Sequence, residues 1–114
     1  MAPGTHINAM GSNSLARREL DESAVNRADV ICVDSREVAL LEAGDLLPGL
    51  EKGRFTPRQL LELGDLVAGF RVGRQHDKDV SLFESQGLAI QDVALGWELL
   101  QKARVSGLGQ TLPY

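Results

Sequence analysis

The sequence predicts an α/β protein in which about three parallel strands are flanked by helices and the last element is a long helix. Three short apolar runs, near residues 5–9, 30–34 and 80–84, have the length of strands. Stretches with helical spacing and helix-capping residues separate these runs. Strands that alternate with helices in this way form parallel sheets with right-handed crossovers.

The first predicted strand, residues 5–9, opens into a loop of small and polar residues. Gly11 to Ser14 form this polar cluster, and the basic pair Arg17 and Arg18 follows. In open parallel sheets, ligands bind outside the carboxyl ends of the strands. We therefore expect a site at this strand end, although the same cluster is also typical of an ordinary turn.

Capping residues mark the two helices that surround the second predicted strand. Asp21 predicts a short helix that runs to about residue 28, because its carboxylate can accept from the amides of the first turn. Ser35 predicts a helix over 36–43 in the same way, and Gly44 should end it in a left-handed conformation. Between the helices, Val30 to Val33 are continuously apolar, as in a strand covered on both faces.

The middle of the chain is predicted to contain a loop and one further helix before the third strand. Residues 45–55 include Pro48, Gly49 and Gly53, which favour a loop. Thr56 and Gln59 have the spacing of a capping box around Pro57, so the pattern predicts a helix over 57–68.

The last predicted helix covers residues 88–104 and has a wide apolar surface. One stripe and a neighbouring side carry its apolar residues, so the surface is broader than the single stripe of a surface helix. These residues are Ile90, Val93, Ala94, Trp97 and Leu100 on the stripe, and Leu88, Leu95 and Leu99 beside it. Two interpretations remain: the helix is buried on two sides by its own chain, or part of this face packs against a partner.

Composition limits the class of protein. A chain of 114 residues forms at most one small domain, and a net charge of −4 provides no basic field for nucleic acid. Cys32 is the single cysteine and lies in an apolar run, which favours a reducing, cytoplasmic location. No apolar run approaches the ~20 residues that span a membrane, and the N-terminus lacks the pattern of a signal peptide. The histidines, the cysteine and the carboxylates show no metal-ligand spacing, so no metal site is expected.

Three passages, taken in order, resemble the ornithine cyclodeaminase/mu-crystallin family. They are GTHINAMGSNSLARREL, ADVICVDSREVALLEAGDL and DVSLFESQGLAIQDVALGWELLQKA. The resemblance implies a Rossmann-like domain that binds NAD or NADP, joined to a substrate-binding and dimerisation domain. The chain has no G-x-G-x-x-G after a strand and no upstream substrate domain. Residues 1–114 are therefore expected to be the C-terminal part of such a protein: the second half of a partial Rossmann-like domain plus the returning helix.

The same resemblance implies cofactor-binding roles for residues at two strand ends. The family has a loop beside the nicotinamide, a basic position that neutralises cofactor charge and a pocket residue after the third strand. This chain has a counterpart of each. The cofactor-binding candidates are Met10, Gly11, Ser12, Arg17 and Ser85. For Arg17, the alternative is a solvated surface arginine.

Asn13 and Gln86 are the substrate-binding candidates. By resemblance, Asn13 occupies the position of an acidic residue that exchanges protons with the substrate in ornithine cyclodeaminase. A neutral amide cannot accept and release a proton near pH 7, which argues against cyclodeaminase chemistry at this catalytic position. Asn13 could still hydrogen-bond a substrate amine or imine, and its alternative role is that of a turn residue.

Two functional hypotheses follow. The first is a part of an NAD(P)-dependent ornithine cyclodeaminase-like or ketimine reductase-like enzyme of amino acid metabolism, acting on a small amino acid or cyclic imine. The second is a non-catalytic module that binds a cofactor or small ligand, or an inactive truncation. The chain alone is expected to be inactive and to bind NAD(P)H weakly, because the glycine-rich pyrophosphate turn is absent. Its edge strand and broad helix face predict a homo-oligomer, or a requirement for the missing upstream half.

Overall fold

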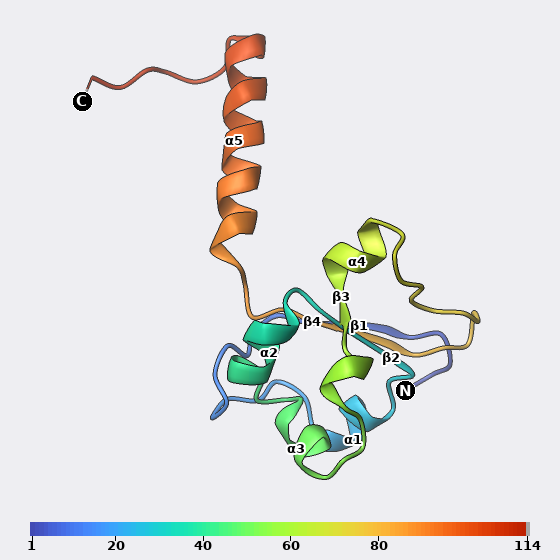
Figure 1. Ribbon diagram of the computed structural model, residues 1–114. Helices are drawn as coiled ribbons and strands as arrows, with labels where there is room; N and C mark the ends of the chain where they lie inside the picture. The colour runs from blue at the N-terminus through green and yellow to red at the C-terminus, as the bar shows by residue number, and fades with distance from the viewer. Residues whose placement is uncertain (114) are drawn as a thin grey trace.

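The protein is built on a four-stranded parallel sheet, shown in Figure 1 in a computed structural model that describes residues 1–113. The sheet has the strand order β1-β4-β2-β3. Its strands are β1 (His6–Ala9), β2 (Val30–Val33), β3 (Leu61–Glu62) and β4 (Ser81–Glu84). The three predicted strands and their parallel pairing are confirmed, and β3 is an additional strand that the sequence did not predict.

One face of the sheet carries the hydrophobic core. Three short helices cover this face, and they lie below the sheet in Figure 1: α1 (Glu22–Asn26), α2 (Arg36–Glu42) and α3 (Leu47–Glu51). Because successive strand residues point to opposite faces, alternate apolar residues of the strands meet these helices. The buried core cluster consists of Ala9, Val25, Ile31, Val33, Ala39, Ala43, Leu46, Leu60 and Leu82.

The predicted helix starts are confirmed by their capping bonds. The Ala24 amide donates to Asp21 Oδ1 at 2.7 Å at the start of α1. The Val38 amide donates to Ser35 Oγ at 3.4 Å at the start of α2. Both caps satisfy amides that have no partner within the helix.

The prediction that Gly44 ends a helix in a left-handed conformation is wrong. The helix α2 ends at Glu42, and Gly44 is not among the glycines with positive φ. Carbonyl oxygens of Ser14, Leu15 and Arg17 occupy the space that a Cβ atom of Gly44 would need. Glycine is required here because the loop after β1 packs directly against the backbone.

The predicted loop over 45–55 is also wrong, because it contains α3. Pro48 lies in the first turn of this helix, where its missing amide hydrogen costs no bond. Gly49 is buried against the Phe55 ring, which lies where a Cβ atom would be. Two of the three residues that favoured a loop, Pro48 and Gly49, therefore act as a helix start and a close packing contact.

The predicted helix over 57–68 is replaced by three short elements. A 3₁₀ turn, η1 (Pro57–Gln59), leads into β3, and α4 (Leu63–Val67) follows. The capping box exists, since the Thr56 amide donates to Gln59 Oε1 at 2.8 Å, but it begins only the 3₁₀ turn. Leu60 is buried in the core and Leu61 pairs with Cys32 of β2, so tertiary packing overrides the local helix signal.

The other face of the sheet is partly covered by α4, which lies above the sheet in Figure 1. A cavity of about 380 Å³ between them is lined by Cys32, Phe83 and Leu66 among others. His6 borders it and is held by hydrogen bonds. Its Nε2 lies 3.1 Å from Asn8 Oδ1, and its Nδ1 lies 2.8 Å from Ser81 Oγ.

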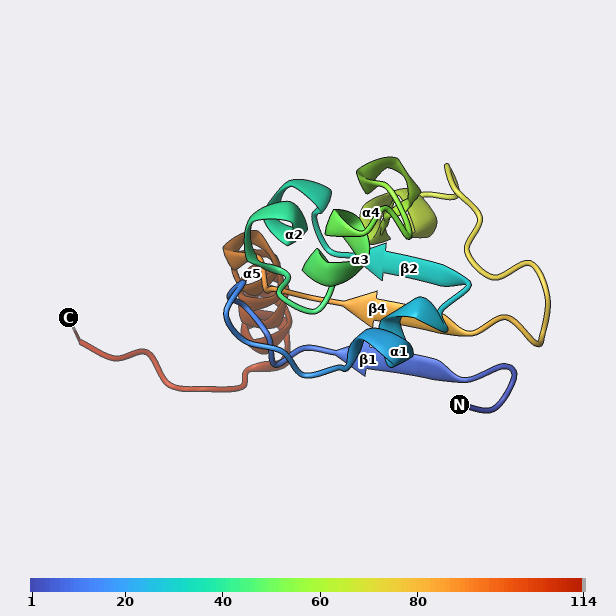
Figure 2. The same cartoon turned by 90° about the horizontal axis from the view of Figure 1, so that it is seen from below.

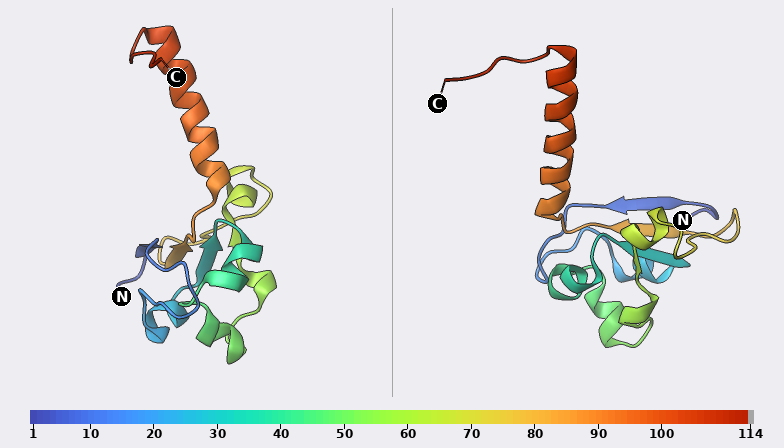
Figure 3. Two further views of the ribbon diagram at one scale, coloured as in Figure 1. Left: turned by 90° about the vertical axis from the view of Figure 1, so that its left-hand side faces the viewer. Right: turned by 45° about the horizontal axis from the view of Figure 1, so that its top comes forward.

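The last helix, α5 (Ala89–Ser106), projects away from the sheet, as Figures 1 and 3 show. It buries none of its residues, and Gly107 ends it in a left-handed conformation with φ of 63°. The predicted helix is confirmed, but the interpretation that its own chain buries it on two sides is wrong for the described residues. Its large exposed apolar side chains include Ile90, Val93, Leu95, Trp97, Leu99 and Leu100. Across residues 1–113, no helix combines the length and apolarity that crossing a bilayer requires.

Candidate functional site

The carboxyl ends of three neighbouring strands meet at one end of the sheet (Figure 2). Glu84 at the end of β4 is in register with Ala9 of β1 on one side and with Val33 of β2 on the other. The Ser85 amide then donates to the Ala9 carbonyl at 3.0 Å. The segments that begin at Met10 and Ser85 therefore start side by side at the same end of the sheet, as expected. The binding roles predicted for them remain predictions.

Most candidate residues in the loop after β1 are exposed. Those with exposed side chains or backbone are Met10, Gly11, Asn13 and Arg17. Ser12 is the exception: it is buried, and its hydroxyl donates to the Arg17 carbonyl at 2.7 Å. Ser12 therefore shapes the loop, while the exposed residues are available to a ligand.

Gly11 is exposed, and its backbone amide is bound by a carboxylate of the same chain. Its N–H donates to the carboxylate of Glu19, and a Cβ atom on Gly11 would lie 2.8 Å from Glu19 Oε2. A side chain at this position would displace the carboxylate. Glycine is therefore needed for an anionic group to reach this backbone amide.

Asp34 is a site residue that the sequence analysis missed. It follows β2 directly, and its Oδ2 accepts from the Ser85 hydroxyl at 2.7 Å and from the Gly87 amide at 2.9 Å. Its Oδ1 accepts from the Ser35 amide at 2.8 Å. Asp34 thus fixes the path of the chain after β4, and the Ser85 hydroxyl is already bound. Asp34 could have been identified from the sequence by its position, because it is a carboxylate immediately after a predicted buried strand.

Two more carboxyl groups are buried beneath these loops. Glu84 is 1% exposed and Asp45 is 2% exposed. Asp45 Oδ1 accepts from the amides of Glu19 and Leu20 at 2.8 and 3.0 Å, which anchors the end of the loop after β1. Glu84 Oε1 accepts from Gln86 Nε2 at 3.2 Å. Within the described residues, Asp45 Oδ2, Glu84 Oε2 and Gln86 Oε1 are buried without a hydrogen-bond partner.

The buried carboxyl group of Glu84 holds its proton at neutral pH. Burial, followed by the negative charges of Asp45, Glu19 and Asp34, raises the pKa of Glu84 to about 8, and the Gln86 hydrogen bond lowers it by less than these effects raise it. Desolvation disfavours the charged form, and neighbouring carboxylates add repulsion. The strand end therefore contains a neutral carboxylic acid under the loop that carries Gln86.

The arrangement is suited to binding through hydrogen bonds and charge. Arg17 offers a cation, Gly11 an anion-binding amide, and Asn13 and Gln86 offer amide groups. No group of three metal-ligating side chains that could hold an ion is found within residues 1–113.

Comparison with known proteins gives consistent matches over almost the whole chain. The model of the ornithine cyclodeaminase/mu-crystallin family matches residues 1–107. A Δ1-pyrroline-2-carboxylate reductase of Bacillus thuringiensis is 36% identical over 112 residues, covering 97% of this chain and 34% of that protein.

Two solved structures show the same fold at similar identity. Thermococcus litoralis Δ1-pyrroline-2-carboxylate reductase, in complex with NADH and L-proline, superposes with a TM-score of 0.84 at 34% identity, over 98% of this chain and 35% of that one. An archaeal alanine dehydrogenase dimer with bound NAD gives a TM-score of 0.79 at 31% identity, over 100% of this chain and 35% of that one. The chain thus spans about a third of the length of the proteins that it matches.

Proposed function

Because the chain belongs to the ornithine cyclodeaminase/mu-crystallin family, we propose that it is the second half of a Rossmann-like NAD(P)-binding domain in an imine-reducing enzyme. The substrate class is a small cyclic imine, or the amino acid formed from it by reduction. The observation that carries this proposal is the TM-score of 0.84 with a Δ1-pyrroline-2-carboxylate reductase bound to NADH and L-proline. We place the enzyme in the cytoplasm, as part of a homo-oligomer.

The residues at the carboxyl end of the sheet fit a nicotinamide cofactor and a small substrate. The Gly11 amide binds the Glu19 carboxylate, and in this proposal an anionic group of the ligand takes the place of that carboxylate. Gln86 has a buried amide oxygen without a partner among the described residues, which fits a ligand that donates an N–H. The cofactor would supply a hydride. In this proposal the exposed Met10, Gly11 and Arg17 contact the cofactor. Ser12 and Ser85 act through their hydrogen bonds to Arg17 and Asp34, which hold the two segments that orient the cofactor against the substrate.

Asn13 decides which reaction of the family is proposed. Its amide can hydrogen-bond the nitrogen of an imine but cannot exchange a proton with it near pH 7. Reduction of an imine needs a hydride at carbon and a proton at nitrogen, and this proton can come from solvent. We therefore propose reduction through a nicotinamide hydride and not a cyclodeaminating lyase activity.

The alternative function is non-catalytic binding of a cofactor or small ligand. Two observations favour it: Asn13 is neutral, and the Ser85 hydroxyl is engaged by Asp34. Neither group can act as a general base in this arrangement. A binding protein of this kind would hold NADH without turning over a substrate.

A chimera tests these alternatives. This chain replaces the matching third of the Thermococcus litoralis reductase, so that the glycine-rich half and the substrate domain are supplied. We expect oxidation of NADH that depends on Δ1-pyrroline-2-carboxylate. An Asn13→Ala variant of the chimera should lose turnover while retaining NADH binding. Gln110→Ala, at an exposed position of the C-terminal tail, is the control and should change neither.

The outcomes separate the two functions. A folded chimera that binds NADH but does not oxidise it with the imine would support the binding module. A folded chimera that does not bind NADH would refute the assignment of the cofactor site to this chain.

A further inference from the structure

A side chain of the protein itself occupies the anion position in the loop after β1. The Glu19 carboxylate accepts a hydrogen bond from the Gly11 amide. A Cβ atom on Gly11 would lie 2.8 Å from Glu19 Oε2 and 3.2 Å from its Cδ, so the carboxylate lies directly against the glycine backbone. Both residues are exposed, so this contact lies on the surface of the loop and not beneath it.

One hydrogen bond holds the Glu19 carboxylate in this position. Within residues 1–113, the Gly11 amide is the one group that donates to it. Glu19 takes part in none of the three ion pairs formed between described residues. The neighbouring Arg18 is directed elsewhere, because its Nε donates to the Gly44 carbonyl at 3.1 Å.

The charges beneath the loop oppose this position of the carboxylate. Asp45 Oδ1 accepts from the Glu19 amide at 2.8 Å, so a second carboxylate lies next to the Glu19 backbone. The charges of Asp45, Glu19 and Asp34 together raise the pKa of the buried Glu84 carboxyl group, which places all of them in one region. Rotation of the Glu19 side chain into solvent therefore loses one hydrogen bond and relieves repulsion between like charges.

The backbone of the loop can stay in place when this side chain moves. The amides of Glu19 and Leu20 donate to Asp45 Oδ1 at 2.8 and 3.0 Å, and neither bond involves the Glu19 side chain. The Ser12 hydroxyl donates to the Arg17 carbonyl at 2.7 Å and holds the loop across its middle. The movement required is thus a change of rotamer, which exposed side chains make on the picosecond to nanosecond timescale.

We propose that the contact between Glu19 and Gly11 is autoinhibitory: the Glu19 carboxylate blocks the Gly11 amide until an anionic group of a ligand displaces it. The displacing group is a carboxylate or a phosphate, the anionic groups that an imino acid and a dinucleotide carry. The identity of this ligand rests on the proposed function, whereas the blocking contact and its release do not. Removal of the Glu19 carboxylate should therefore raise the affinity of the loop for anions.

Acetate is the probe for the 114-residue chain, and ¹H–¹⁵N NMR of the Gly11 amide follows its binding. Glu19→Ala should raise the acetate affinity measured at this amide by about tenfold or more, because the amide is freed for a charge-assisted hydrogen bond. Glu19→Gln keeps an acceptor oxygen without the charge, so its affinity should lie between those of Glu19→Ala and the unaltered chain. Glu42→Ala is the matched control: it removes the same charge from an exposed position of α2 and should leave the affinity unchanged.

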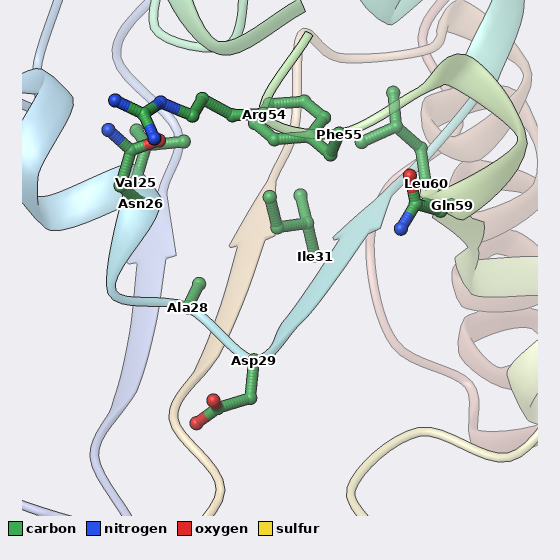
Figure 4. A pocket seen from close by; sticks show the side chains of 9 residues that line it. All are labelled: Val25, Asn26, Ala28, Asp29, Ile31, Arg54, Phe55, Gln59 and Leu60. Carbon is green, nitrogen blue, oxygen red and sulfur yellow. The ribbon is translucent and has the colours of Figure 1, made fainter.

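The measurement must report on Gly11 itself, because acetate can also meet a cation elsewhere in the chain. Arg54 lines a cavity of about 480 Å³ (Figure 4). Asp29 and Gln59, which precede β2 and β3, place this cavity at the opposite end of the sheet from the candidate site. Shifts confined to this cavity, unchanged acetate affinity in Glu19→Ala, or an equal increase in Glu42→Ala would each overturn the proposal.

The chimera with the Thermococcus litoralis reductase identifies the displacing group. If Glu19→Ala lowers the Kd for NADH, the cofactor supplies this group, and if it lowers the KM for Δ1-pyrroline-2-carboxylate, the substrate does. Unchanged values for both ligands would overturn the autoinhibition. Tighter acetate binding by the Glu19→Ala chain, together with a chimera that binds no NADH, would refute the cofactor assignment and support the blocking contact.

Discussion

Among single residues, Glu84 is the one whose ionisation this fold opposes most strongly. Its carboxyl group is enclosed at the end of β4 and faces the carboxylates of Asp45, Glu19 and Asp34. The Gln86 amide is its one hydrogen-bond partner among the described side chains. The folded protein therefore binds a proton at Glu84 more tightly than the unfolded chain does, and folding stability must depend on pH.

We predict that the chain becomes less stable as pH rises from about 5 to 8.5. The pKa of Glu84 is about 8 in the fold against an ordinary value of 4.5. The protonated side chain therefore contributes fully to the free energy of unfolding below the lower pKa. This contribution is lost as the pH rises to the higher pKa. The loss is about 1.4 kcal/mol of unfolding free energy per pH unit between them. Urea unfolding at several pH values measures it.

Glu84→Gln should flatten this dependence, whereas Glu98→Gln, at an exposed position of α5, should leave it intact. An equally steep profile in Glu84→Gln would show that another group is responsible.

Asp34 organises the chain after β4 through its hydrogen bonds, so we predict a stability loss for Asp34→Asn. The amide cannot accept from the Ser85 hydroxyl, the Gly87 amide and the Ser35 amide together. Hydrogen bonds to charged groups contribute about 1.5–3 kcal/mol each, and we expect a total loss in that range. Urea unfolding measures the loss, and hydrogen exchange of the Gly87 amide should become faster. Asp92→Asn, at an exposed position of α5, should change stability by less than about 0.5 kcal/mol. Unchanged exchange at Gly87 would argue against this role of Asp34.

Among the elements, those with local signals were predictable from the sequence. Asp21 and Ser35 cap their helices with their own side chains, and the continuous apolar run from Val30 to Val33 is typical of a strand covered on both faces. β3 could not be predicted in this way. Leu61 becomes a strand residue because Cys32, far away in sequence, offers it a pairing partner, and Leu60 is drawn into the core beside it.

The same distinction explains the candidate site. Its location follows from strand ends that meet in a parallel sheet, so Met10 and Ser85 could be placed together from sequence. The contact between Asp34 and Ser85 joins residues 51 positions apart. Nor does the sequence show that Glu84 is enclosed, because its neighbour Asp45 comes from the segment that was predicted to be a loop.

The junction between α2 and the loop after β1 gives a prediction for a single element. Gly44→Ala should destabilise the chain by about 1–3 kcal/mol, because the new methyl group would meet backbone carbonyls of Ser14, Leu15 and Arg17, which cannot rotate away. Thermal unfolding measures the change. Gly64→Ala in α4 is the control: nothing lies near its Cβ position, so it should be neutral or stabilising by up to about 1 kcal/mol. Equal effects of the two substitutions would contradict the packing seen at Gly44.

For the whole molecule, we predict that the 114-residue chain binds NADH or NADPH poorly or not at all. The pyrophosphate of a dinucleotide is normally held at a helix N-terminus after a glycine-rich turn. The sequence contains no G-x-G-x-x-G after a strand. Nicotinamide fluorescence or titration calorimetry measures the binding. The chimera with the glycine-rich half supplied is the positive control, and micromolar affinity of the chain alone would contradict the prediction.

The molecule also presents two surfaces that favour association. β1 lies at the edge of the sheet, with one side unpaired within the described residues. α5 extends away from the sheet in a molecule measuring 55 × 33 × 25 Å and exposes apolar side chains along its length. Soluble monomers seldom expose apolar patches above a few hundred Å², and burial contributes roughly 25 cal/mol per Å² before association entropy is subtracted.

We therefore predict that the chain oligomerises or aggregates at micromolar concentration unless a complementary upstream fragment is present. Analytical ultracentrifugation at several concentrations measures this directly. Leu95 and Leu99 are 61% and 57% exposed on α5, so Leu95→Lys or Leu99→Lys should raise the monomer fraction while the fold is retained. Lysine is tolerated at such positions because no neighbouring residue of the same chain has to give way. Gln101→Lys, also on α5, adds the same charge without removing an apolar side chain and should have little effect. A monodisperse 12.3 kDa monomer with a cooperative thermal transition would instead show that α5 is stable without a partner.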